Sequence, residues 1–284
     1  MLLIGLTGSI ATGKSTVASL LTSPPYSLPH IDADVLARDA VAPGTRAYRR
    51  IVAHFLPTTP DLLLPPPSPS SSSSPSQTTP EPPTSTPRPL NRAVLGRRVF
   101  GADATRTHDR AVLNGIVHPA VRRAMAWSVA GAYARGHWAV VLDVPLLYEA
   151  GLDVWCGAVV MVGVRDEAVQ VARMVERDGE GKGVSVEEAR ERVRSQGGVE
   201  GKVERCRFGE GWVVWNDAGR EELRGEVERV VSGLREGRPW WWGGALWVCP
   251  VLAGLVGVWV VARNWWARRR WEKMVSERER EKGE

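Results

Sequence analysis

Cysteine is scarce in this chain, and the few that are present exclude two kinds of site. Cys156, Cys206 and Cys249 lie far apart among the 284 residues, with no Cys-x-x-Cys pair and no histidine cluster beside them. A disulfide scaffold and a structural zinc site both need closely patterned ligands. The sequence therefore predicts neither.

A concentrated basic region is also missing. Lysine and arginine total 37 against 32 acidic residues, a net charge of +5 that is scattered over the whole chain. Proteins that bind nucleic acids concentrate positive charge in a patch or stripe. The composition therefore does not favour nucleic acid as a partner.

The N-terminus lacks the basic start of a secretory signal. It reads Met-Leu-Leu-Ile-Gly-Leu-Thr-Gly and reaches glycine after a few apolar residues, which is typical of a buried strand. A chain of this length has room for one domain of ordinary-to-large size with attachments. We expect an intracellular globular protein with a domain over residues 1–235.

Proline is unevenly distributed. Twelve of the 20 prolines fall between Pro57 and Pro89, together with an unbroken run from Ser70 to Ser74. Such a stretch has almost nothing apolar to bury, so it cannot offset the entropy lost on ordering. The composition predicts a disordered insertion over residues 57–89, with a docking or phosphorylation tract as the alternative.

Tryptophan is unevenly distributed too, with eight of 13 between Trp240 and Trp271. Residues 240–262 carry no charge over 23 positions, and as a helix they would reach about 34 Å, enough to cross a membrane core. We therefore predict a transmembrane anchor at 240–262 and a charged tail at 263–284. A buried soluble helix, or a hairpin kinked at Pro250, are the alternatives.

The predicted anchor implies a location. The domain would remain in the cytosol, and the anchor would insert into the mitochondrial outer membrane or the endoplasmic reticulum. A hairpin would suit a lipid-droplet surface instead.

Between these two segments, short apolar runs alternate with helical patterns. Strands are predicted at residues 2–6, 30–32, 139–144, 158–164 and 213–215. Helices are predicted at 14–21, 93–99, 111–134 (interrupted near Pro119), 167–177, 186–196 and 220–234. This order favours an α/β domain with a doubly wound parallel sheet.

The first turn from strand to helix carries the clearest chemical motif. Gly8-Ser9-Ile10-Ala11-Thr12-Gly13-Lys14-Ser15, followed by Thr16, fits the P-loop pattern G-x-x-x-x-G-K-[ST]. Its backbone N–H groups and the helix N-terminus would hold phosphates, Lys14 would bridge the β- and γ-phosphates, and the Ser15 hydroxyl would ligate Mg²⁺. The motif predicts ATP or GTP binding.

Two carboxylates follow the second predicted strand, Asp32 and Asp34. Because the carboxyl ends of neighbouring parallel strands share one crevice, this pair is expected to face the phosphates. A carboxylate there can accept the proton of an attacking hydroxyl or support the magnesium shell.

These motifs, in this order, resemble dephospho-CoA kinase. The likeness is carried by GLTGSIATGKSTVA, IDADVLAR, LNGIVHP and VLDVPLLYE, and it covers about residues 1–56 and 90–231. The resemblance implies a P-loop kinase fold with helical lid and substrate regions. It also implies the last step of coenzyme A synthesis, with ATP and Mg²⁺ phosphorylating the ribose 3′-hydroxyl of dephospho-CoA.

The resemblance assigns roles to individual residues. Asp34 corresponds to the general base, and Asp32 would support it or the metal. Arg173 and Arg177 correspond to lid arginines over the ATP phosphates, with Arg192 and Gln196 on the next lid helix. Asp143 is either an outer magnesium ligand or a strand-end carboxylate, and His118 has a structural role or contacts the substrate.

One departure from the family pattern lies inside the P-loop, where Ala11 replaces its third glycine. Another small P-loop kinase and a membrane-tethered, non-catalytic nucleotide-binding module are the alternative functions. Association with the preceding enzyme of coenzyme A synthesis is a further expectation, because no second nucleotidyl-transfer domain is visible in the sequence.

Overall fold

A computed structural model describes residues 1–65, 88–101, 103–182, 185–195, 199–237 and 241–283. The described chain divides into two compact units. The first comprises residues 1–32 and 128–284, and the second comprises residues 33–127. The core of the predicted insertion, residues 66–87, lies outside the described residues.

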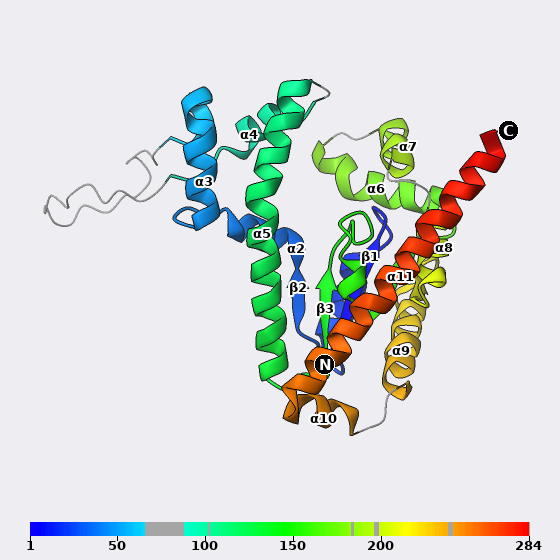
Figure 1. Cartoon of the computed structure of the whole chain (residues 1–284). Coiled ribbons are helices and arrows are strands. Elements are labelled where there is room, and N and C mark those ends of the chain that lie inside the picture. Colours follow the sequence, from blue (N-terminus) through cyan, green and yellow to red (C-terminus); the bar gives the residue numbers. More distant parts are fainter. Residues whose placement is uncertain (66–87, 102, 183–184, 196–198, 238–240, 284) are drawn as a thin grey trace, which may run out of the picture. The chain divides into compact units, whose positions relative to one another are not determined.

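The first unit contains a parallel sheet with the strand order β2-β3-β1-β4-β5 (Figure 1). The strands are β1 (Leu2–Gly8), β2 (His30–Asp32), β3 (Ala139–Asp143), β4 (Ala158–Gly163) and β5 (Trp212–Trp215). In β3 every residue is buried, which explains its continuous Ala-Val-Val-Leu run. The predicted parallel α/β sheet is confirmed.

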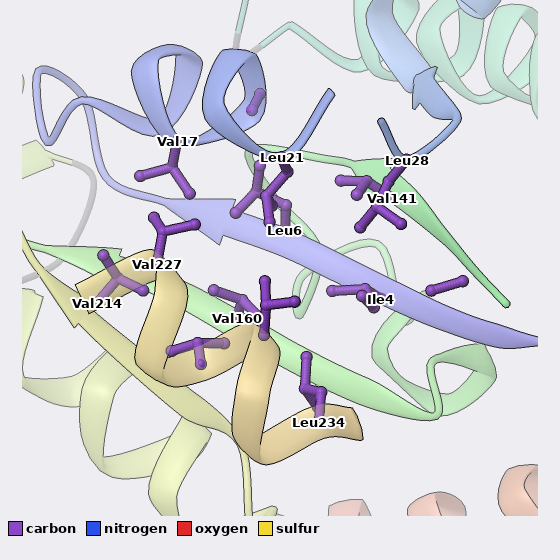
Figure 2. Close-up of a cluster of buried hydrophobic side chains, with 14 of the residues drawn as sticks. Ile4, Leu6, Val17, Leu21, Leu28, Val141, Val160, Val214, Val227 and Leu234 are labelled. Carbon is purple, nitrogen blue, oxygen red and sulfur yellow. The ribbon is translucent and has the colours of Figure 1, made fainter. Parts of the chain in front are cut away.

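The helices of this unit are α1 (Lys14–Thr22), α6 (Glu167–Lys182), α7 (Val186–Ser195), α8 (Val199–Phe208), α9 (Arg220–Glu236), α10 (Trp242–Val248) and α11 (Pro250–Gly283), with the short η3 turn (Asp153–Trp155). Three of them, α1, α8 and α9, cover the two faces of the sheet. On one face α1 and α9 pack against Ile4, Leu6 and Val160 (Figure 2). On the other face Met161, the next residue along β4, packs against Val203 of α8.

The second unit is helical. It contains α2 (Ala33–Ala40), α3 (Arg46–Phe55), η1 (Leu56–Thr58), η2 (Pro60–Leu62), α4 (Arg92–Val99) and most of α5 (Ala104–Ala134). Its core gathers Ile51 and Phe55 of α3, Leu95 of α4 and Ile116 of α5. Thr45 caps α3 by accepting from the Tyr48 N–H, and Asn91 caps α4 in the same way.

Two expectations about this unit are wrong. α5 runs unbroken through Pro119, where an interruption was predicted. The predicted disordered segment also begins too early, because Leu62 is completely buried and Leu63 forms an antiparallel bridge with Leu90. The edges of the Pro/Ser-rich stretch therefore belong to the folded unit, since these leucines have core positions that composition alone does not reveal.

The predicted transmembrane anchor at 240–262 is not supported. Among the described residues, no helix combines the length and the apolar character needed to cross a membrane. The uncharged stretch is divided between α10 and α11, which meet at Cys249 in a non-helical conformation. α11 then continues through Arg263 into its charged half, so its apolar part is short.

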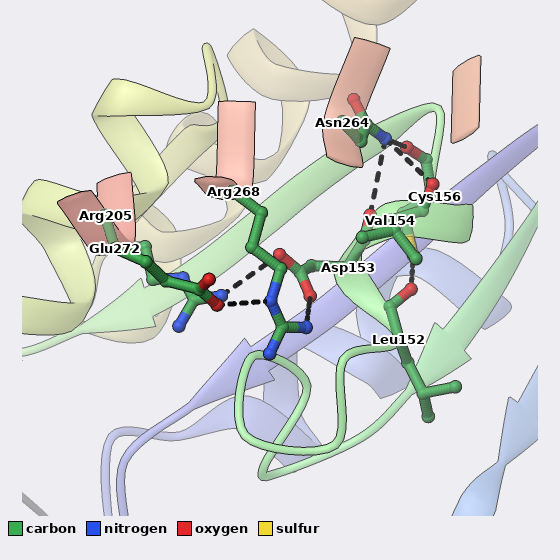
Figure 3. A network of polar contacts seen from close by, with 8 residues as sticks. All are labelled: Leu152, Asp153, Val154, Cys156, Arg205, Asn264, Arg268 and Glu272. Atoms are coloured by element: carbon green, nitrogen blue, oxygen red, sulfur yellow. Dashed lines mark hydrogen bonds and ion pairs between the residues drawn. The ribbon is translucent and has the colours of Figure 1, made fainter. Parts of the chain in front are cut away.

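α11 instead packs along the first unit, against η3 and α8. The Asn264 side chain donates to the carbonyls of Asp153, Val154 and Cys156 at 3.4, 3.2 and 2.7 Å (Figure 3). Arg268 forms an ion pair with the Asp153 carboxylate, which Arg205 of α8 also approaches. The α11 helix is thus held by partly buried polar contacts.

Candidate active site

The turn between β1 and α1 has the backbone geometry of a tight glycine loop. Gly13, immediately before α1, has φ of 86°, and a side chain there would place its Cβ 2.2 Å from the Asn216 Nδ2 atom. Glycine is therefore required at this position. Ala11 has φ of 58°, so the alanine that replaces a glycine here adopts the left-handed conformation at a modest steric cost.

Side chains from distant parts of the chain hold the backbone of this loop. Asn216, just after β5, donates to the Thr12 carbonyl at 2.9 Å, and Gln170 of α6 donates to the Ile10 carbonyl at 3.1 Å. Within the loop, the Thr12 hydroxyl donates to the Ser9 carbonyl at 2.8 Å. Two of its carbonyls thus accept from side chains elsewhere in the chain and a third from within the loop, which restrains the loop conformation.

The loop's donors are suited to an anion. The first N–H groups of a helix have no acceptor within that helix, and they carry its partial positive charge. α1 begins at Lys14, and the Thr16 N–H already donates to the Gly13 carbonyl at 3.0 Å, so the donors that can face an anion lie at Lys14 and Ser15. The Ser9 hydroxyl is buried without a partner among the described residues, and so has a donor to offer. The geometry fits a bound phosphate.

Lys14 and His30 meet at the carboxylate of Asp143. The Lys14 ammonium donates to Asp143 Oδ1, and His30 Nε2 lies 3.3 Å from Asp143 Oδ2. An ionised carboxylate can only accept, so the His30 nitrogen that faces it carries a proton. Burial by itself raises the pKa of Asp143, but the hydrogen bonds from His30 and Lys14 outweigh it and lower that pKa.

Asp32 lies beside Asp143 at the end of the neighbouring strand, as the strand register shows. β3 pairs directly with β1, from which the glycine loop continues, and β2 lies one strand further out. Asp32 is half-buried, and Asp34 is exposed in the first turn of α2. Asp34 belongs to the second unit, but the chain keeps its Cα within about 8 Å of the Asp32 Cα.

The oxygen atoms at this edge of the sheet fit a magnesium ion. Ser15 supplies a hydroxyl, while Asp32 and Asp143 supply carboxylates, and Mg²⁺ takes oxygen ligands. Among the described residues, no group of three or more His, Cys, Asp and Glu side chains could hold a metal by itself. This agrees with the usual protein magnesium site, in which substrate phosphates and water complete the coordination.

The two lid helices pack directly on the loop. Val171 and Met174 of α6 and Val193 of α7 form a small buried cluster, against which Ile10 and Ala11 pack. Arg173 donates to the Asn216 carbonyl at 2.9 Å, so it supports the same residue that holds Thr12. Arg177 and Arg192 are exposed on α6 and α7, and Gln196 lies outside the described residues.

Part of this site is not predicted from the sequence. Asn216 and Gln170 stand outside every predicted motif, although Asn216 directly follows the strand β5. The contact between Asp143 and Lys14 is also unforeseen. His118, for which a structural role or a substrate contact was expected, is exposed on α5 in the second unit.

Comparison with known proteins identifies relatives of this chain. The family model for dephospho-CoA kinase matches residues 2–62 and 86–222. The dephospho-CoA kinase CAB5 of Saccharomyces cerevisiae is 36% identical over 83% of this chain and 83% of its own length. The dephospho-CoA kinase of Geobacillus kaustophilus is 39% identical over 81% of this chain and 96% of its own length.

Solved structures show the same fold. The protein TT1252 from Thermus thermophilus aligns with a TM-score of 0.57 and 27% identity, covering 84% of this chain and 98% of its own. The dephospho-CoA kinase from Campylobacter jejuni aligns with a TM-score of 0.56 and 21% identity, covering 83% and 98% of the two chains.

Proposed function

The chain belongs to the dephospho-CoA kinase family, and on that premise we propose how its residues share the reaction. It transfers the γ-phosphoryl group of ATP to the ribose 3′-hydroxyl of dephospho-CoA, which yields coenzyme A and ADP. The observation that carries the assignment of roles is the glycine loop, with Lys14 held by Asp143 at its mouth.

ATP binds through the glycine loop. The backbone N–H groups over residues 8–16 surround the phosphates, and the Ser9 hydroxyl offers an additional donor. Lys14 compensates charge on the β- and γ-phosphates, and Asp143 positions its ammonium. Because Asn216 and Gln170 hold the loop, little of the binding energy is used to organise it.

Asp34 is the proposed general base. It orients the ribose hydroxyl and accepts its proton while the hydroxyl oxygen attacks the γ-phosphorus in line, and the bond from phosphorus to the β-phosphate oxygen breaks. Support comes from its place two residues after β2 and from its exposed side chain. Asp32 supports the base or the metal from the end of β2.

Ser15 and Asp32 would hold Mg²⁺, and Asp143 fits an outer position in its shell. When bound, the ion neutralises phosphate charge that builds up during transfer. Arg173 acts through Asn216 on the loop, while Arg177, one helical turn further along α6, is the lid arginine proposed to reach the phosphates. Lid closure would exclude water, which otherwise competes as the acceptor.

Two further predictions concern the protein's surroundings. The first and second units are both expected to lie in the cytosol. Association with the enzyme that makes dephospho-CoA also stays a prediction.

The role of Asp34 is tested on the full-length chain with a coupled ADP assay. Dephospho-CoA is expected to stimulate ATP consumption, and nucleosides are not. Asp34→Asn should lower turnover by about 10²-fold while ATP binding, measured by calorimetry, stays near that of the unchanged protein. Asp39→Asn, an exposed aspartate near the end of the same helix, is the matched control. Near-normal turnover in Asp34→Asn would assign the base elsewhere.

A further inference from the structure

α11 has two faces of different character. Half-buried positions recur at helical spacing along one side, among them residues 253, 256, 260, 264, 267 and 271, and α11 packs against η3 and α8 of the same unit. Its exposed positions recur in the same way on the opposite side. Figure 1 shows α11 as one long helix, coloured from orange to red, that runs past α8. One face of α11 thus packs against the protein, and the opposite face is exposed.

The exposed face of α11 is strongly apolar over the N-terminal half of the helix. The large exposed side chains that share it are here called the outer stripe: Val251, Leu255, Val258, Trp259, Trp265 and Trp266. Leu255, Val258 and Trp259 are 64%, 69% and 60% exposed. A contiguous apolar patch of this kind on a folded protein marks an interaction surface. Contacts of the inner face already hold the helix, so folding of the first unit does not require the stripe.

Positive charge lies along the C-terminal part of the outer stripe. No aspartate or glutamate occurs from Pro239 to Trp271, whereas Arg263, Arg269 and Arg270 are exposed along the same part of α11. The Arg263 guanidinium lies 5.3 Å from the centre of the Trp259 ring, and that of Arg269 lies 4.2 Å from the centre of the Trp265 ring. Tryptophan beside arginine on an apolar helical face is typical of helices that lie in a membrane interface.

We propose that the outer stripe binds the surface of an anionic lipid bilayer, with α11 lying parallel to the membrane plane. The apolar side chains would enter the boundary between headgroups and acyl chains, and the three arginines would contact lipid phosphates and carboxylates. A second copy of this chain is a poorer occupant. A symmetric dimer through this face would offer the arginines no carboxylate partner from residues 239–271 of the other copy.

The test uses the full-length protein and sedimentation with vesicles. One set of vesicles is phosphatidylcholine alone, and the other is phosphatidylcholine mixed with phosphatidylserine. Binding to the mixed vesicles, a weaker response to pure phosphatidylcholine and a loss of binding with added salt are expected. The double variant Leu255→Ser with Trp259→Ser should bind at least about tenfold more weakly, because it removes two large apolar side chains.

Two controls separate the stripe from general effects. Trp127→Ser changes a 73% exposed tryptophan of α5 in the second unit and should bind like the unchanged protein. Arg269→Gln with Arg270→Gln should lower binding to the anionic vesicles by about tenfold, with little change for phosphatidylcholine. Kinase activity in solution and melting temperature should stay unchanged in every variant, because these side chains are exposed.

Several outcomes overturn the proposal. One is that the unchanged protein sediments with neither type of vesicle. Another is that the Leu255→Ser, Trp259→Ser double variant binds as strongly as the unchanged protein. Vesicle-bound protein that resists extraction with alkaline carbonate would indicate an embedded segment, contrary to surface binding. A dimer in solution that the same double variant dissociates would assign the stripe to a second copy.

Discussion

Two aspartates on the same connection between strands make an instructive comparison. Asp143 ends β3, and Asp153 opens η3 ten residues later. Both are nearly buried, with side chains 7% and 12% exposed, and each has two cationic or proton-bearing partners. The partners of Asp143 are Lys14 and His30, and those of Asp153 are Arg205 and Arg268.

Their pKa values nevertheless shift in opposite directions. Burial is the largest influence on both, and by itself it raises the pKa of a carboxyl group. At Asp143, the hydrogen bonds from His30 and Lys14 outweigh burial and lower the pKa. At Asp153, the charges of Arg205 and Arg268 and the hydrogen bond from Arg205 lower the pKa less than burial raises it, and the pKa stays raised.

The opposite pKa shifts distinguish two kinds of cluster. The cluster around Asp143 is suited to catalysis, and the cluster around Asp153 is suited to holding neighbouring elements together. Asp143 keeps its charge and holds the ammonium of Lys14 at the glycine loop. Asp153 joins three elements, because its own η3 turn, Arg205 of α8 and Arg268 of α11 meet there (Figure 3). Removing a cation should therefore damage activity at the first cluster and stability at the second.

The largest expected effect is on activity, at the first cluster. Lys14→Ala removes a contact to the phosphates, and kcat/KM should fall by about 10²-fold or more, with weaker ATP binding. Arg205→Ala removes a cation from the second cluster, and should leave kcat/KM within a few-fold of the unchanged protein. Steady-state kinetics with ATP and dephospho-CoA measure both. Equal losses in the two variants would show that the clusters do not differ in role.

The next effect is on stability, at the second cluster. Asn264→Ala removes the side-chain donor to the carbonyls of Asp153, Val154 and Cys156, of which that of Asp153 still accepts from the Cys156 N–H, and should lower the free energy of unfolding by about 1–3 kcal/mol. Urea denaturation measures the change. Arg270→Ala, on the exposed side of the same helix, is the matched control and should unfold like the unchanged protein. An Asn264→Ala variant of full stability would mean that these hydrogen bonds contribute nothing to docking.

What could be predicted from the sequence depended on how local the signal was. The glycine loop and the strands β1 and β2 are encoded within short stretches, and the structure places them as expected. The contact between Lys14 and Asp143 joins residues 129 positions apart, and that between Thr12 and Asn216 joins residues 204 apart. No local pattern contains such pairs, so only the fold reveals them.

The C-terminal segment shows the opposite failure, in which a strong local signal misled. An uncharged, tryptophan-rich run predicted a spanning helix, but the run is broken at Cys249 and its helix continues into charged residues. The contacts of Asn264 and Arg268 with η3 explain why part of the helix carries polar side chains toward the protein. Likewise, Leu62 belongs to a core that its proline-rich neighbours conceal.

The smallest effect is on the pH dependence of stability, and it tests the comparison most directly. The pKa of Asp143 is lowered from the ordinary 3.8, so above pH 3.8 its carboxylate makes its full contribution to the free energy of unfolding. The contribution is lost as the pH falls through the folded-state value. The pKa of Asp153 is raised, so between 3.8 and its folded-state value the native protein binds the proton more readily than the unfolded chain. Its contribution therefore weakens as the pH rises through that interval.

Urea denaturation of the unchanged protein, Asp143→Asn and Asp153→Asn from about pH 6 to about pH 3 measures these contributions, because an asparagine does not titrate there. As the pH falls, the unfolding free energy of the unchanged protein should decline relative to Asp143→Asn. Over the same range it should rise relative to Asp153→Asn. The two differences thus have opposite slopes. Parallel slopes would mean that burial and partners act alike on both carboxylates, and the contrast between the clusters would then fail.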